Sequence, residues 1–139
     1  MEVTVISTVI SKLHTIILSI YRPPNSRLHW FETLNDLLHE VTVLGKIIIM
    51  GDLNCDLLKP SSWQSQHLNK ILSIVNSNLL NYEPTPTRLS PTTATCLDII
   101  SIDRSFNIIS YQVVNLAISD QLSSQSMCQN IRNNPTGTC

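Results

Sequence analysis

The sequence predicts a mixed α/β fold, and three patterns predict it. Two β-branched stretches, residues 3–9 and 13–21, partly alternate between apolar and polar side chains, which indicates strands. Residues 26–43 and 63–79 repeat apolar side chains every three or four positions, as amphipathic helices do. Residues 46–50 form a continuous apolar run, which is typical of a strand buried on both faces. We therefore expect a sheet covered by helices.

The first two strands are expected to pair, because only Ser11 and Lys12 separate them and so short a link favours a tight antiparallel turn. Pro23 and Pro24 end the second strand, since proline cannot donate to a neighbouring strand. Either Asn25 or Ser26 can cap the helix that follows. Its inward side is predicted from apolar positions, which are Phe31, Leu34, Leu38 and Val41, and Gly45 ends it.

The second helix is expected to bury five apolar side chains, which are Leu68, Ile71, Leu72, Val75 and Leu79. Residues 81–95 are rich in Pro and Thr and predict a long loop. Two further strands are expected near residues 96–102 and 110–118. The folded domain is predicted over residues 1–121. Residues 122–139, rich in Ser, Gln and Asn, are expected to form a disordered tail.

Composition favours one folded domain, because 42% of the 139 residues are hydrophobic and only 14% are charged. The net charge is −1, whereas a protein that binds nucleic acid by charge alone is basic. Any phosphate chemistry is therefore expected to rest on a metal ion. No apolar run is long enough to cross a membrane, and a secretory leader is not expected, because the sequence opens with an acidic residue. No C-x-x-C or zinc-finger spacing involves the cysteines, which are Cys55, Cys96, Cys128 and Cys139. An intracellular protein is expected, although disulfide pairing stays open.

Polar residues that follow predicted strands are the candidates for chemistry. Asp52 and Asn54 follow the apolar run, where a carboxylate can orient or deprotonate a water and an amide can donate to a phosphate. These residue types also favour turns, which is the commoner role for such a sequence. Asp120 also ends a strand and suits a cation such as Mg²⁺, although strand-end acids more often face water. Asp98 lies within an apolar strand and needs a partner, catalytic or structural.

Four further side chains are candidates for contact with a phosphate. Tyr21 and Arg22 offer a phenol and a guanidinium, or they form an ordinary strand exit. Thr87 and Arg88 offer a hydroxyl and a cation to DNA, or they belong to a polar loop. None of the four histidines has the spacing of a metal ligand, and all are predicted to be solvated or packed: His14, His29, His39 and His67.

The order of these motifs resembles that of a known superfamily. The chain reads I-Y-R-P-P at 20–24, I-I-I-M-G-D-L-N at 47–54, P-T-R at 86–88, C-L-D-I-I at 96–100 and I-S-D at 118–120. Over about residues 13–121 this order resembles the endonuclease/exonuclease/phosphatase (DNase I-like) superfamily. Within it, the chain is most similar to the endonuclease domain of LINE-type non-LTR retrotransposons. The resemblance implies a four-layer α/β sandwich with its active site at one rim.

The resemblance implies a role for each matching residue. Tyr21 matches a tyrosine that bonds the target phosphate. Asp52 and Asn54 match the pair that positions the attacking water and the phosphate. Asp98 matches the aspartate that orients a catalytic histidine, and Asp120 matches a carboxylate at the metal site.

The family's chemistry is phosphodiester hydrolysis with Mg²⁺ or Mn²⁺, which leaves a 3′-hydroxyl that primes reverse transcription. DNA is the partner that the resemblance implies. Thr87 and Arg88 fall where the family has a loop that faces DNA. Whether this chain still binds the metal stays open.

Two departures from the family pattern predict a loss of activity. The family's S-D-H reads S-D-Q here, and Gln121 can carry neither a proton nor a positive charge. The family also begins with a segment that bears an asparagine and a metal-binding glutamate. That segment is expected to be missing, because Met1 lies close to the Y-R-P-P strand and Glu2 is too near that strand to replace the glutamate.

The sequence thus predicts a partial four-layer α/β sandwich that is a degenerate, inactive remnant of a metal-dependent DNA-nicking domain. Two alternatives stay open: an active endonuclease completed by a separate N-terminal segment, and a pseudo-nuclease that binds nucleic acid without cutting. We expect the carboxylates and the amide to converge beside Tyr21, and these are Asp52, Asn54, Asp98 and Asp120. A strand at the broken edge, such as residues 3–9, is expected to expose apolar surface.

Overall fold

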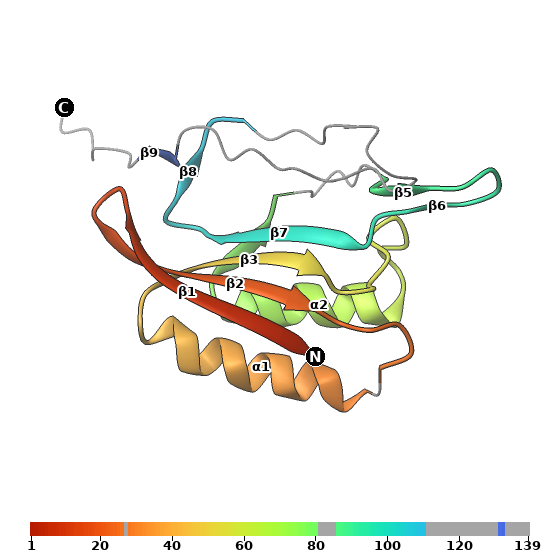
Figure 1. Cartoon of the computed structure of the whole chain (residues 1–139), viewed down its shortest axis with the longest axis horizontal. Coiled ribbons are helices and arrows are strands. Elements are labelled where there is room, and N and C mark those ends of the chain that lie inside the picture. Colours follow the sequence, from red (N-terminus) through yellow and green to blue (C-terminus); the bar gives the residue numbers. More distant parts are fainter. Residues whose placement is uncertain (27, 81–85, 111–130, 133–139) are drawn as a thin grey trace.

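The structure is a computed structural model that describes residues 1–26, 28–80, 86–110 and 131–132. Figure 1 labels its elements, which are β1 (Glu2–Ile10), β2 (Leu13–Tyr21), α1 (His29–Thr42), β3 (Lys46–Asp52), α2 (Trp63–Ile74), β4 (Ser77–Leu79), β5 (Arg88–Leu89), β6 (Ala94–Thr95), β7 (Asp98–Asp103), β8 (Asn107–Ile108) and β9 (Ile131–Arg132).

Five strands form one mixed sheet in the order β1-β2-β3-β7-β4, and both helices cover the same face of it (Figure 1). The neighbours β2 and β3 are parallel, with α1 as the crossover between them, and the other neighbouring pairs are antiparallel. Consequently β2 and β3 finish at the same end of the sheet, where the antiparallel β7 begins. We call this the Asp52 end, and the opposite end the far end.

The main core lies between the sheet and the two helices. The central strands alternate strictly, so that every second side chain points toward the helices. From β2 and β3 these inward side chains are Ile16, Leu18, Ile20, Ile47 and Ile49. The helices contribute all but two of the predicted positions, together with Trp30, and these are Phe31, Leu34, Leu38, Val41, Leu68, Ile71 and Leu72. Val75, just after α2 ends, also belongs to this core. A smaller cluster lies on the other face of the sheet, made of Ile48, Leu80, Ile100, Ile102 and Phe106.

The predicted hairpin is confirmed, with Ser11 at φ 50° and Lys12 at φ 67° in its two-residue turn. The predicted cap of the first helix is wrong. Leu28 occupies the cap position without a side-chain hydrogen bond. The Ser26 hydroxyl instead donates to the carbonyl oxygen of Pro23 at 2.6 Å, which closes the turn before the helix.

The second helix is shorter than predicted. It ends at Ile74, and the chain turns at Asn76, whose φ of 55° is left-handed. Leu79 therefore lies on β4, paired with β7, and not on the helix. The predicted loop contains a short hairpin formed by β5 and β6.

The predicted strand near residues 110–118 lies almost entirely outside the described residues, and so do Asp120 and Gln121. Within the predicted tail, residues 131–132 form β9, which pairs with β8. Among the described residues, none of the helices combines the length and the apolar character needed to cross a membrane.

Candidate active site

Asp52 and Asp98 are direct cross-strand partners, the last pair of β3 and β7. Side chains alternate along each strand, so Asp52 shares a face with Ile48, and Asp98 shares the same face with Ile100. Both isoleucines belong to the cluster on the face away from the helices. The two carboxylates therefore lie side by side on that face, at the Asp52 end of the sheet.

Tyr21 ends β2 at the same place. The parallel register pairs Ser19 with Met50, and its continuation by two residues brings Tyr21 beside Asp52. The next backbone N–H, that of Arg22, donates to the carbonyl oxygen of Asp52 at 2.9 Å. Tyr21 is 42% exposed, so its phenol is accessible. The structure thus brings Tyr21 to the two aspartates.

Both carboxylate oxygens of Asp52 have a nearby partner. Its Oδ1 accepts the backbone N–H of Asn54 at 2.8 Å, and its Oδ2 lies 3.5 Å from the guanidinium of Arg88. Burial raises the pKa of the Asp52 carboxyl and the charge of Asp98 adds to the rise, whereas the Asn54 hydrogen bond and Arg88 oppose it. The balance leaves the pKa above its ordinary value, because the burial effect is the largest.

We expect Asp52→Asn to stabilise the fold at neutral pH. A carboxyl whose pKa rises on folding contributes stability below its unfolded pKa, and that contribution is lost as the pH rises through the folded pKa. Asparagine removes this cost and keeps an oxygen for the N–H of Asn54. Thermal melts should show that the free energy of unfolding rises by about 0.5–2 kcal/mol at pH 7, and that this gain vanishes under acidic conditions. Asp36→Asn, on an exposed position of α1, is the control. A loss of stability of the Asp52→Asn variant at pH 7 would contradict the raised pKa of Asp52.

Asn54 and Arg22 fasten the end of β2 to the loop after β3. Asn54 adopts φ 48°, a left-handed conformation that asparagine tolerates. Its side-chain amide donates to the carbonyl oxygen of Arg22 at 2.6 Å. In return, the Arg22 guanidinium donates to the carbonyl oxygens of Leu53 at 3.1 Å and Asn54 at 3.2 Å. These reciprocal bonds fix the position of Asp52 relative to Tyr21.

The Arg22 side chain therefore does not reach the surface beside Tyr21. Only 7% of Arg22 is exposed, and its guanidinium lies over the Trp30 ring, 4.9 Å from the ring centre. A further nitrogen donates to the carbonyl oxygen of Ser26 at 3.4 Å. Sequence reasoning offered Arg22 as a phosphate contact, but the structure gives it a buried role that holds the site together.

Thr87 is also buried, and Arg88 is not. The Thr87 hydroxyl accepts the backbone N–H groups of Leu97 at 3.2 Å and Asp98 at 3.5 Å, and its own N–H donates to Thr95 at 2.9 Å. Thr87 thus holds the start of β7. The Arg88 side chain is 43% exposed, so it alone of the pair faces solvent while it reaches Asp52.

Sequence reasoning missed Asp56, which connects the loop after β3 to the segment that leads into β7. Its Oδ1 accepts the backbone N–H groups of Leu58 at 3.2 Å and Cys96 at 3.1 Å, and Lys59 lies 3.3 Å from its Oδ2. The loop after β3 is therefore tied to the segment that enters β7. An aspartate that bonds the N–H two residues on is a recognisable turn signal, and Asp52 uses the same device.

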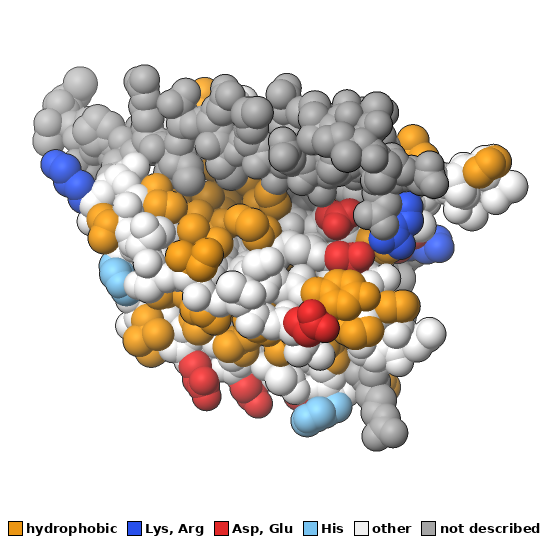
Figure 2. Space-filling model, viewed as in Figure 1, with side chains coloured by type: hydrophobic (Ala, Val, Ile, Leu, Met, Phe, Trp, Pro, Cys, Tyr) orange, Lys and Arg blue, Asp and Glu red, His pale blue; other side chains and the backbone are white. Residues whose placement is uncertain are grey.

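The remaining predicted residues are not placed. Asp120 and Gln121 lie outside the described residues. Within residues 1–26, 28–80, 86–110 and 131–132, no three His, Cys, Asp or Glu side chains come close enough to hold a metal ion. In the space-filling view, acidic and basic side chains meet where β3 ends and the β5–β6 hairpin begins (Figure 2).

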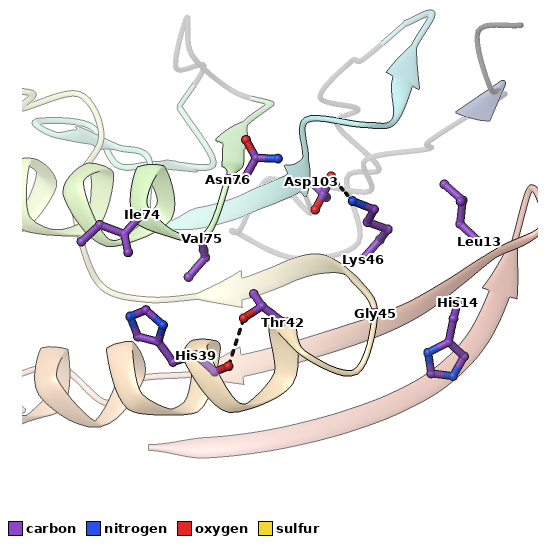
Figure 3. A pocket seen from close by; sticks show the side chains of 10 residues that line it. All are labelled: Leu13, His14, His39, Thr42, Gly45, Lys46, Ile74, Val75, Asn76 and Asp103. Carbon is purple, nitrogen blue, oxygen red and sulfur yellow. Dashed lines mark hydrogen bonds and ion pairs between the residues drawn. The ribbon is translucent and has the colours of Figure 1, made fainter. Parts of the chain in front are cut away.

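A pocket of about 490 Å³ lies at the far end of the sheet, where Gly45 and Lys46 lead into β3 (Figure 3). His14 and His39 line it, and the Lys46 ammonium lies 3.6 Å from the carboxylate of Asp103. None of the residues predicted to bind a phosphate or a metal lines this pocket, so it is separate from the Asp52 end.

Comparisons with known proteins agree with this geometry. A family model described as endonuclease-reverse transcriptase matches residues 15–125. No curated protein matches the chain. Among solved structures, the endonuclease domain of TRAS1, a telomere-specific non-LTR retrotransposon, is similar with a TM-score of 0.67 at 14% identity. The match covers 86% of this chain and 59% of that one, and at this identity it shows the fold alone. The chain therefore belongs to the endonuclease-reverse transcriptase family and has its DNase I-like α/β fold.

Proposed function

We propose that this chain carries the phosphodiester-binding end of a metal-dependent, DNA-nicking endonuclease of a non-LTR retrotransposon, and that it does not cut as it stands. The observation that supports this most is the direct pairing of Asp52 with Asp98 on one face. Tyr21 lies beside this pair with its phenol exposed, and Arg88 reaches it from the β5–β6 hairpin.

The chemistry of the donors fits a divalent cation. Two neighbouring carboxylates offer the oxygen ligands that Mg²⁺ and Mn²⁺ prefer, and a cation would relieve the repulsion that helps to raise the pKa of Asp52. We propose Asp52 and Asp98 as oxygen ligands of this ion; Asp120, the metal residue that the resemblance implies, lies outside the described residues. When bound, the ion would polarise the phosphate and acidify a water.

The protein's own side chains would bind and orient the phosphate and the DNA backbone. The Tyr21 phenol would donate to a phosphate oxygen. Asn54 would orient the phosphate through its amide, which is held in place by the carbonyl of Arg22. Arg88 would contact the DNA backbone, while the buried Arg22 and Thr87 act as positioning residues.

Two features support a loss of turnover. Gln121 stands where the family pattern has its histidine, and an amide cannot shuttle a proton. In addition, both oxygens of Asp52 already have partners, in Asn54 and Arg88, so this carboxylate would have to give up its ion pair with Arg88 before it could bind a cation or orient a water. A pseudo-nuclease that binds DNA without cutting shares this site. An active enzyme completed by another segment is the second alternative, and metal-dependent cutting that begins only when such a segment is added would reveal it.

The location of the site is tested by mapping amide chemical shifts of the labelled chain with a short DNA duplex and Mg²⁺. We expect changes to gather around Tyr21, Asn54 and Asp98, and the amides near the pocket of Figure 3 to stay unchanged. Arg88→Ala should weaken DNA binding about tenfold, because a charged contact is lost. Arg104→Ala, an exposed arginine that bonds Asn78, is the matched control. Equal effects of the two substitutions, or shifts centred on the far end, would refute this location.

A further inference from the structure

β1 is an edge strand with an apolar exposed surface. It pairs with β2 on one side and, within the described part of the chain, with no strand on the other. In Figure 1 it lies in front of the sheet, with no described element before it. Its exposed side chains include Val5 at 51%, Ile6 at 53% and Val9 at 65%, which confirms the exposure expected for residues 3–9. Natural edge strands are usually protected by charges or proline, and β1 has neither between Glu2 and Lys12.

The turn of the hairpin determines which backbone groups point outward. In a two-residue turn with both φ values positive, the flanking residues, Ile10 and Leu13, exchange hydrogen bonds with each other. Every second residue of β1, counted back from Ile10, therefore turns its N–H and C=O toward β2. The outward-facing groups belong to the residues between them, which are Val3, Val5, Ser7 and Val9.

We propose that two copies of this chain pair through β1, antiparallel about a two-fold axis at Ile6, which joins the two five-stranded sheets into one. In this register Val3 faces Val9 of the second copy, and the outward backbone groups of both strands form ladder hydrogen bonds. Thr4 faces Thr8 of the second copy, and Ile6 faces its own equivalent. Most facing side chains are therefore alike, apolar against apolar or hydroxyl against hydroxyl, which are pairs that stabilise antiparallel strands; the exception is Val5, which faces Ser7 of the second copy.

Charge selects this antiparallel arrangement. In the antiparallel register Glu2 faces Ile10 of the second copy, and Lys12 of that copy lies in the turn just beyond Ile10, so the opposite charges come to the same end of the pair. Symmetry repeats this arrangement at the other end. A parallel pairing would instead bring the two Glu2 side chains together. A second copy is thus the occupant whose charge pattern matches this edge.

The two-fold axis runs through the sheet, so both copies keep their helices on the same face. The two Asp52–Asp98 pairs then lie at opposite ends of the joined sheet and on its other face. The contact is one strand long, so we expect a weak dimer with a dissociation constant in the micromolar range. The dimer does not depend on the proposed function.

Sedimentation of the full chain over a concentration series tests the pairing, and we expect a reversible monomer–dimer equilibrium. Ile6→Lys places two like charges face to face on the axis and should weaken the dimer about tenfold or more. Val43→Lys is the matched control, because it makes the same kind of change at an exposed position after α1. Circular dichroism checks that both variants are folded. A wild-type chain that stays monomeric, or equal dimerisation of both variants, overturns the proposal.

The register is tested separately. Under mild oxidation Ile6→Cys should cross-link two copies, because its equivalents meet at the axis, whereas Val9→Cys should not, because it faces Val3. The unsubstituted chain, with its own cysteines, serves as the background. Charge reversal gives a second check: Glu2→Lys and Lys12→Glu should each weaken the dimer, and the double variant should restore it. Equal cross-linking of both cysteine variants, or a double variant as weak as the single ones, overturns this register.

Discussion

Gly51→Ala is expected to destabilise the protein by about 2–6 kcal/mol and to separate β2 from β3 at the Asp52 end. Gly51 adopts φ 139°, which side chains rarely allow, and strain of this kind costs about 1–3 kcal/mol. A Cβ at this position would lie 1.9 Å from the carbonyl oxygen of Ile20, which belongs to the backbone of β2 and cannot swing aside. Relief of such overpacking costs about another 1–3 kcal/mol.

The strand that would have to move is the one that carries Tyr21, so the same substitution should separate Tyr21 from Asp52. Urea unfolding followed by circular dichroism measures the change in stability. Met50→Ala, the neighbouring and partly exposed residue, is the control and should cost about 1 kcal/mol or less. An alanine variant of Gly51 within 1 kcal/mol of the parent, on the order of the control, would show that β2 and β3 do not approach as closely as described.

Much of the fold could be predicted because local patterns and tertiary packing agree. The alternation of β2 and the uninterrupted run in β3 each indicate how many faces of the strand are buried. Because only Ser11 and Lys12 separate β1 from β2, these two strands can pair with each other only in the antiparallel direction. The helical positions Leu34 and Leu38 lie on one side of α1 and are buried as expected.

The parts of the fold that sequence reasoning missed depend on contacts that compete with the expected helix pattern. Leu79 continues a helical repeat, but its partner Ser101 draws it into the sheet after the turn at Asn76. The cap of α1 is absent because Ser26 bonds backward to Pro23. Neither competing contact is visible in the local pattern.

The candidate site, like the fold, was predicted in part. The motif order was enough to bring Tyr21, Asp52 and Asp98 together, because parallel β2 and β3 finish where β7 begins. It could not show which polar side chains face inward. The burial of Arg22 depends on carbonyl groups of Leu53 and Asn54, about thirty residues further along the chain.

Our central claim is that this end of the sheet is built to bind a phosphodiester but does not complete the reaction. A general acid or base contributes about 10²–10⁴-fold to a rate, and a donor to the transition state about 10²–10³-fold. In our proposal Gln121, at the position of the family's histidine, accounts for both losses, because an amide carries neither a transferable proton nor a positive charge. The two losses need not multiply, because residues that act as a unit are not additive, yet either alone is large.

Nicking of supercoiled plasmid by the full chain in Mg²⁺ or Mn²⁺ tests this claim most directly, with Asp52→Ala and the exposed Asp36→Ala measured alongside. We predict that the three proteins nick at the same background rate and that added metal changes none of them. Metal-dependent nicking by the unsubstituted chain and by Asp36→Ala, abolished in Asp52→Ala, would contradict the claim and show that this domain is a working endonuclease.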